Sequence, residues 1–277
     1  MACTAVLEGK LHFTIVCASC KMEHRSGGVD MGERVPWSRE DIIIAYALYC
    51  ITPLNQIRPA NKLIQQVAEH FPHSTSSLAM RMQNFAAIDP NSKVKGATHA
   101  AKIDRAIFDE FKHDWGALSI QAENLTGLAL FDANPLNGAK PLSSLTDKNR
   151  VSRERHFFRA SVFASYENTC CISGMTIPAM LVASHIKPFR SCRTSSERTD
   201  PENGLLLNTF YDKAFDQGLI TVLPDYTLRC ATQVKAQQDA FTHRWLISLE
   251  GERIALPARF YPNRDCLRYH NDVIFKG

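Results

Sequence analysis

The sequence lacks the features that would place it in a specialised class of protein. No apolar run approaches the roughly 20 residues that a bilayer-spanning helix needs. The N-terminal stretch, interrupted by charges, has no signal-peptide layout. The nine cysteines are odd in number and irregularly spaced, which argues against the disulfide framework of a secreted protein. We find no internal repeats or low-complexity tracts. The sequence therefore favours a cytoplasmic globular protein without a membrane anchor.

A strong excess of one charge is also missing. The chain has 32 Lys and Arg against 28 Asp and Glu, a net charge of +4 with a pI near 8.6. This mild basicity permits an anionic partner without requiring one. The densest run of positive charge contains Lys140, Lys148, Arg150, Arg153, Arg155 and Arg159. Two interpretations stay open for this run: a solvated face, or an arm that contacts phosphates.

The order of patterns along the 277 residues predicts an α+β protein in four parts. Residues 1–33 form a lead-in, and residues 34–130 carry helical periodicity. Residues 131–150 are rich in Pro, Gly, Asn and Ser and are predicted to be a linker. A second domain of short strands and helices follows at 151–277.

The lead-in holds one pattern compatible with metal binding. "CASCKMEH" places Cys17, Cys20 and His24 at zinc-ligand spacing. A closed zinc site needs four ligands, and no second pair follows at a familiar distance. The pattern therefore favours ordinary thiols over bound Zn²⁺.

Three amphipathic stretches predict helices between residues 34 and 90. They are "PWSREDIIIAYALY" with Ser38 as N-cap, "RPANKLIQQVAEHF", and "HSTSSLAMRMQNFAAIDP" capped by Ser74 or Thr75. The third would show Ser77, Arg81 and Asn84 on its outer face. This arrangement fits a helix-turn-helix-like unit whose last helix contacts DNA, with Ser77 and Arg81 as candidate contacts. Plain helix packing with a polar outer face explains the pattern equally well. A further helix is predicted in "AKIDRAIFDEFKHDW".

The second domain shows the order strand, strand, helix. An amphipathic helix, "RERHFFRASVFASY", precedes the strands "MLVASHI" and "GLLLN", a short helix around "DKAF", and the strands "GLITVL" and "TLRCA". The basic residues before and within the first helix, Arg150 and Arg153 among them, are candidate DNA contacts.

Four polar residues on the predicted strand, strand and helix have side chains suited to phosphodiester hydrolysis. His185 ends the first strand, and a histidine with a pKa near 6.5 is a suitable general base. Asn203 begins the next strand, where its amide can hold an imidazole or the loop. Asp212 and Asp216 are spaced i, i+4 and share one helix face. Two carboxylates there suit a hard cation, foremost Mg²⁺, with Mn²⁺ as the alternative.

The quoted residues resemble the HNH endonuclease family. The similarity rests on Ser184-His185-Ile186 with Pro188, Asn203-Gly204-Leu205 with Leu207, and Asp212 with Phe215-Asp216 and Gly218. "YENTCCISG" and "LPARFYPNRDCLRYHNDVIF" extend it over residues 151–277, and the helical region resembles the domain fused to such nucleases. The resemblance implies a ββα-metal nuclease domain acting on DNA, as an endonuclease or nickase, in restriction or anti-phage defence with partner proteins.

The resemblance also implies individual roles. His185 would be the general base, Asn203 its support, and Asp212 the leading metal ligand, with Asp216 a second ligand or a structural cap. Lys187 is a candidate DNA contact beside the base. Ser184 stands where many family members have an Asp or His ligand, and no final His follows. Two alternatives therefore remain, a DNA-binding ββα domain without catalysis and a nuclease acting on RNA. The target sequence, strand number and oligomeric state are left open.

Overall fold

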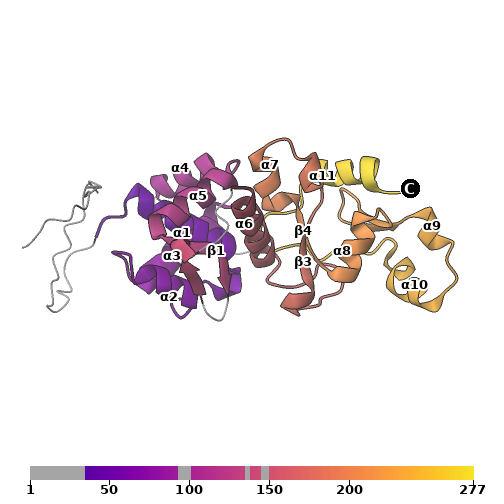
Figure 1. The fold of residues 1–277 in the computed structure, drawn as a ribbon, viewed down its shortest axis with the longest axis horizontal. Helices are drawn as coiled ribbons and strands as arrows, with labels where there is room; N and C mark the ends of the chain where they lie inside the picture. The colour runs from indigo at the N-terminus through magenta and orange to yellow at the C-terminus, as the bar shows by residue number, and fades with distance from the viewer. Residues whose placement is uncertain (1–34, 93–100, 135–137, 145–149) are drawn as a thin grey trace, which may run out of the picture. The chain divides into compact units, whose positions relative to one another are not determined.

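The chain folds as an α+β protein. A computed structural model describes residues 35–92, 101–134, 138–144 and 150–277. In this part of the chain helices predominate, and the strands pair into three two-stranded antiparallel sheets (Figure 1). Among the same residues no helix is long and apolar enough to cross a membrane. The expected lead-in, with Cys17, Cys20 and His24, lies outside the described residues.

Five helices form the first half of the described chain. They are α1 (Arg39–Ile51), α2 (Lys62–Ala68), α3 (Thr75–Ile88), α4 (Lys102–Phe111) and α5 (Trp115–Thr126), with a 3₁₀ turn, η1, at Leu54–Gln56. Ser38, Asn61 and Ser74 cap α1, α2 and α3 through their side-chain oxygens. The capping signals at Ser38 and Ser74 therefore predicted where α1 and α3 begin, whereas the Asn61 cap of α2 was not predicted. Helix α5 was not predicted.

The five helices surround a core built largely of aromatic rings. Tyr46, on the fully buried face of α1, lies within ring-contact distance of Phe85, Phe108 and Trp115. Phe260, from the C-terminal part of the chain, packs edge-on against Trp115 at 5.2 Å. A residue of the predicted nuclease half thus completes the helical core.

The described part of the expected linker contains a β-hairpin. Strands β1 (Leu128–Asn134) and β2 (Gly138–Pro141) pair antiparallel, followed by the 3₁₀ turn η2 (Leu142–Ser144). The Gln66 side chain of α2 forms two hydrogen bonds with the backbone of Ala139, at 2.6 and 2.7 Å. These bonds join residues 73 positions apart, which explains why local periodicity gave no sign of the hairpin.

Helix α6 (Arg150–Ser165) contributes to both halves. Phe157 belongs to the aromatic core of the helical half, whereas Phe158, the next residue, belongs to a second core with Val162 and Tyr166. In Figure 1, α6 lies between the helices of the first half and the hairpin formed by β3 and β4, in agreement with its contacts. The expected boundary at residue 151 therefore falls at the start of a shared helix.

The elements after α6 follow the predicted order. The helices are α7 (Ser195–Thr199), α8 (Thr209–Asp216), α9 (Thr232–Lys235), α10 (Ala240–Trp245) and α11 (Arg264–Tyr269), and the strands are β3 (Leu181–His185), β4 (Gly204–Asn208), β5 (Ile220–Val222) and β6 (Leu228–Cys230). Short 3₁₀ turns lie at Pro178–Met180, Phe189–Ser191, Pro201–Asn203 and Ile247–Leu249, and a π-helical turn, η7, at His270–Ile274. The strand, strand and helix predicted around "MLVASHI", "GLLLN" and "DKAF" are confirmed as β3, β4 and α8.

Two close approaches position the β3–β4 hairpin and the end of α8. A Cβ at Gly204 would lie 2.4 Å from the Val162 side chain of α6, so only glycine lets this helix pack so closely on the hairpin. Gly218, after α8, has a φ of 67°, and a Cβ there would lie 2.1 Å from the Ile274 carbonyl oxygen. Both glycines bring backbones together around the site described next.

Candidate active site

His185 is held at the end of β3 by an aromatic ring and a backbone carbonyl. It pairs with Gly204 of β4, and its imidazole stacks on Phe158 with centroids 3.6 Å apart and an interplanar angle of 15°. Its Nε2 lies 3.0 Å from the Arg198 carbonyl oxygen. A carbonyl only accepts hydrogen bonds, so Nε2 carries the proton and Nδ1 offers its lone pair. No described residue donates a hydrogen bond to Nδ1, which is therefore the atom able to take up a proton.

The electrostatic surroundings keep this imidazole neutral. Burial lowers the pKa of His185 to about 4, the Arg198 carbonyl opposes the shift, and the positive charge of Arg155 adds to it. At neutral pH the ring is unprotonated, as a general base must be before it accepts a proton.

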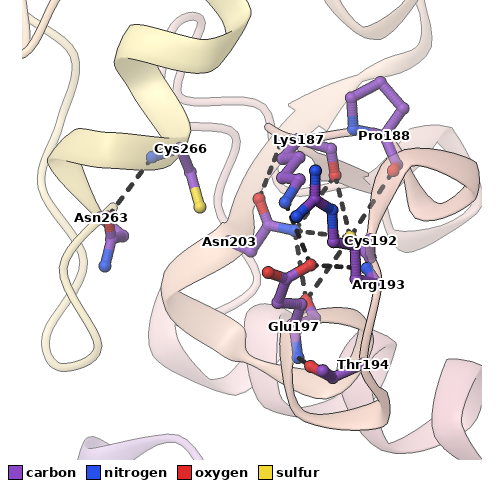
Figure 2. A network of polar contacts seen from close by, with 9 residues as sticks. All are labelled: Lys187, Pro188, Cys192, Arg193, Thr194, Glu197, Asn203, Asn263 and Cys266. Atoms are coloured by element: carbon purple, nitrogen blue, oxygen red, sulfur yellow. Dashed lines mark hydrogen bonds and ion pairs between the residues drawn. The ribbon is translucent and has the colours of Figure 1, made fainter.

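Asn203 organises the loop that supports His185. Its side chain is almost fully buried, and its Oδ1 accepts a hydrogen bond from the Lys187 amide at 2.8 Å. Its Nδ2 donates to the carbonyl oxygens of Lys187 and Glu197, at 3.1 and 3.3 Å (Figure 2). The residue next to Glu197, Arg198, supplies the carbonyl that binds His185. Asn203 therefore closes the β3–β4 loop in the shape that orients the imidazole.

A buried carboxylate adds a second brace to that loop. Glu154 of α6 accepts hydrogen bonds from Ser195 Oγ at 2.5 Å and from Arg198 Nε at 3.0 Å. Both donors lie on α7, so the pair fixes α7 against α6. The Arg198 backbone is thereby held from two sides, by Glu154 and by the Asn203 network.

Asp212 and Asp216 lie one turn apart on α8. The helix begins at Asn208, whose Oδ1 accepts a hydrogen bond from the Tyr211 amide at 2.9 Å. Burial raises the pKa of both carboxyls, and the charge of Asp212 raises that of Asp216 further. The two carboxylates are thus close enough to repel each other, an arrangement that a bound cation would relieve.

Ser184 places a third oxygen next to this pair. Its side chain is 3 % exposed, and its Oγ has no hydrogen-bond partner of ordinary geometry among the described residues. The hydroxyl nevertheless lies close enough to Asp212 to oppose the rise in that carboxyl's pKa. A buried hydroxyl without a partner is costly, because nothing replaces its lost hydration.

The three oxygens fit a hard divalent cation. Successive strand residues point to opposite faces, so Ser184 faces α8 while His185 faces α6. In the described chain no group of three or more His, Cys, Asp or Glu side chains forms a metal site. Two carboxylates and a hydroxyl are oxygen donors, the type that hard divalent cations prefer.

Basic side chains surround the strand end. The Arg155 guanidinium lies over the Phe189 ring at 4.6 Å, and Phe189 itself lies edge-on to His185 at 5.7 Å. Arg190 is exposed and close enough to Asp216 to lower its pKa slightly. Lys187 pairs with Glu197 at 3.0 Å and is only partly exposed. Arg155 and Arg190 are therefore better placed to meet a phosphate than Lys187.

The structure does not bring the other predicted DNA contacts to this site. Arg81 is 13 % exposed and pairs with Asp104 of α4, with Nη1 2.8 Å from a carboxylate oxygen. Asn84 donates to the same carboxylate at 3.2 Å. The α3 face expected to lie outward is thus a contact with α4, because Asp104 is fully buried and needs these donors. Ser77 lies near the start of α3 and is half-buried.

The basic segment before α6 is only partly described. Arg153 pairs with Glu123 of α5 at 2.7 Å and is 14 % exposed, so it braces two helices. The Arg150 side chain and Lys148 lie outside the described part. Phe158 and the Arg198 carbonyl, which hold His185, were missed by the sequence analysis. No local pattern marks a backbone carbonyl 13 residues from its histidine.

Comparison with known families agrees with this geometry. Residues 170–223 match the sequence profile of a family described as HNH endonuclease. This segment contains β3, β4, α8 and β5, and with them all four predicted site residues of the strand–strand–helix unit. The chain therefore contains an HNH endonuclease domain, which indicates a nuclease acting on nucleic acid. No curated protein matches the chain.

Proposed function

We propose that the protein is a metal-dependent endonuclease or nickase that hydrolyses DNA phosphodiester bonds. The observation that carries the proposal is the arrangement at the end of β3. There the accepting Nδ1 of His185 and the buried Ser184 hydroxyl, which lies next to Asp212, belong to consecutive residues. A proton acceptor and a set of hard oxygen ligands at one strand end are what metal-assisted phosphodiester hydrolysis needs.

Each group has a defined part in the proposed reaction. The His185 Nδ1 accepts a proton from the attacking water, while Nε2 stays bound to the Arg198 carbonyl and orients the ring. Asn203 maintains the loop that carries this carbonyl. Ser184, Asp212 and Asp216 would hold Mg²⁺ or Mn²⁺, which supplies a Lewis acid for the phosphate and the leaving oxygen.

The basic residues favour a polyanionic substrate. Arg155 and Arg190 flank the strand end and are exposed, so both can contact phosphates. Such contacts do not read bases. DNA is proposed on the family resemblance, and RNA remains the second substrate to test.

The direct test is a cleavage assay. Purified protein is incubated with supercoiled plasmid and Mg²⁺ or Mn²⁺, with EDTA and the His185→Ala variant as controls. We expect nicked or linear plasmid only with metal and the wild-type histidine. A protein that binds plasmid but never cuts it would instead be a DNA-binding ββα domain without catalysis. The same assay with RNA, in which RNA alone is cut, would overturn the choice of DNA.

The resemblance also leads us to propose a setting in restriction or anti-phage defence, with protein partners. Phage plating on cells that express the wild-type chain or His185→Ala tests this. Protection that disappears with His185 would support it, and equal plating would contradict it.

A further inference from the structure

Three exposed aromatic side chains gather beside the proposed active site. Phe210 of α8 and Phe241 and Trp245 of α10 are 38, 58 and 42 % exposed. Phe210 and Phe241 meet edge-on with centroids 5.5 Å apart. Phe241 and Trp245 are spaced i, i+4 and share one side of α10. We call these three residues the aromatic platform.

The grouping is unusual within this chain. Every other described Phe, Trp and Tyr is buried or half-buried, so the exposed aromatic residues of the described chain all belong to the platform. Single exposed apolar side chains are ordinary, but a contiguous patch of rings marks a binding surface. The aromatic platform is therefore expected to bind a partner.

The charges around the rings indicate what that partner is. The Arg244 guanidinium lies 5.0 Å from the Trp245 ring centroid, and His243 lies in the same turn of α10. Lys213 is exposed and follows Phe210 by three residues, on the same side of α8. No acidic residue lies between Ala240 and Trp245. Flat rings bordered by cations match a strand that presents flat bases and negative phosphates.

Helix α8 carries both Phe210 of the platform and the carboxylates of the proposed site. At 100° per residue, Phe210 and Asp212 lie on opposite sides of this helix, whose diameter with side chains is about 10–12 Å. A strand that passes around α8 can therefore place a phosphate at the carboxylates and bases a few nucleotides away on the rings. We propose that the aromatic platform stacks unpaired bases of the nucleic acid that the site cleaves, an inference that rests on the proposed function.

Binding measurements test the platform without requiring cleavage. Full-length protein in EDTA is titrated into three labelled probes: a single-stranded oligothymidylate of about 20 nucleotides, longer than the roughly 4–16 that one such surface holds, an equally long strand with abasic positions, and a duplex. We expect Phe241→Ala and Trp245→Ala each to weaken binding of the single strand about tenfold. Trp245→Phe should retain most of the affinity, because it preserves a ring.

The abasic strand separates stacking from charge. Wild-type protein should bind it more weakly than the intact strand, whereas the Phe241→Ala/Trp245→Ala variant should bind both alike. Met80→Ala removes a side chain that is 65 % exposed on α3 and should change nothing. Circular dichroism of each variant checks the fold.

Several outcomes would overturn the inference. They are equal wild-type affinity for intact and abasic strands, an unchanged affinity of the double variant, or no binding of the single strand. Binding to phosphatidylserine vesicles that depends on Phe241 and Trp245, with oligonucleotide affinity unchanged, would assign the platform to membranes. If platform variants lose single-strand binding but the wild-type protein never cleaves, the platform stands and the nuclease function fails.

Discussion

The surroundings of His185 and His270 share a stacked ring, a carbonyl at Nε2 and a lowered pKa, but they differ at Nδ1. Each imidazole stacks on a phenylalanine at a centroid distance of 3.6 Å, His185 on Phe158 and His270 on Phe215. Each Nε2 meets a backbone carbonyl, and burial lowers each pKa to about 4. The Nδ1 of His270, however, lies 2.8 Å from Thr221 Oγ1, whereas no described residue donates to that of His185.

This difference separates a structural histidine from a chemical one. The Phe215 carbonyl makes Nε2 the protonated nitrogen of His270, so its Nδ1 accepts a hydrogen bond from the Thr221 hydroxyl, and both nitrogens are satisfied. His270 ties η7 to α8 and β5 and has no lone pair left. His185 keeps one. Stacking and a lowered pKa therefore do not distinguish the two histidines; the open Nδ1 of His185 does, and it supports His185 as the proposed base.

The largest expected effect comes from removing the open nitrogen. His185→Ala should lower the plasmid cleavage rate about 10²–10⁴-fold, the usual cost of losing a general base. Folding and DNA affinity should stay near the wild-type values, measured by circular dichroism and by binding in EDTA. Cleavage at the wild-type rate would remove His185 from the mechanism.

Removing His270, whose two ring nitrogens both form hydrogen bonds, should instead lower the stability of the fold. His270→Ala leaves a cavity beside Phe215 and removes two buried hydrogen bonds, which together cost about 2–4 kcal/mol in the free energy of unfolding. Urea denaturation measures this loss, with the exposed His243→Ala as a control near zero. A His270→Ala protein as stable as wild type would show that this environment is not structural.

The two neutral imidazoles should also make stability depend on pH. Because their folded pKa of about 4 lies below the ordinary 6.5, their contribution is complete above pH 6.5 and is lost as the pH falls toward 4. Each loss reaches about 3 kcal/mol at roughly 1.4 kcal/mol per unit. Asp200 and Glu202, with pKa values raised by burial to about 6 and about 7, act in the opposite direction.

Comparing wild type with His270→Ala separates the pH dependence due to His270 from that due to Asp200 and Glu202. The stability gap between wild type and His270→Ala, from urea titrations at several pH values, should narrow between pH 6.5 and 4. A gap independent of pH would contradict a depressed pKa at His270.

Removing Asp212, on the α8 side of the hairpin, should have a smaller effect on the cleavage rate, and added metal should reverse it in part. Asp212→Ala should weaken the apparent affinity for Mg²⁺ by at least about tenfold, and excess Mg²⁺ or Mn²⁺ should restore part of the rate. Asp109→Ala, which removes a surface carboxylate paired with Lys112, serves as the control. An unchanged metal titration for Asp212→Ala would exclude this carboxylate as a ligand.

The smallest expected effect is a change in the salt dependence of DNA binding, which should distinguish Arg155 from Arg81. Arg155 is exposed beside Phe189, whereas Arg81 is paired with Asp104. Arg155→Ala should flatten the plot of log affinity against log salt by about one unit. Arg81→Ala should leave this slope unchanged. A flattened slope for Arg81→Ala would return α3 to the DNA interface.

The part of the site that could be read from the sequence lies within one short stretch. His185, Asn203 and the carboxylates of α8 follow one another in strand, strand, helix order, so their spacing together with the family resemblance suggested their roles. Ser184 was read only as a departure from the family pattern. Its unpartnered hydroxyl beside Asp212 depends on how α8 packs on β3, and no local signal encodes that.

The sequence by itself determined the helix starts at Ser38 and Ser74, the strand-strand-helix order and the HNH resemblance. Capping and strand alternation act within a few residues, so they can be read locally. Only the tertiary structure decided which arginines face solvent, which imidazole keeps a lone pair, and that Phe210 and Phe241 meet. Those outcomes depend on pairs of residues that are distant in sequence, and packing alone brings such pairs together.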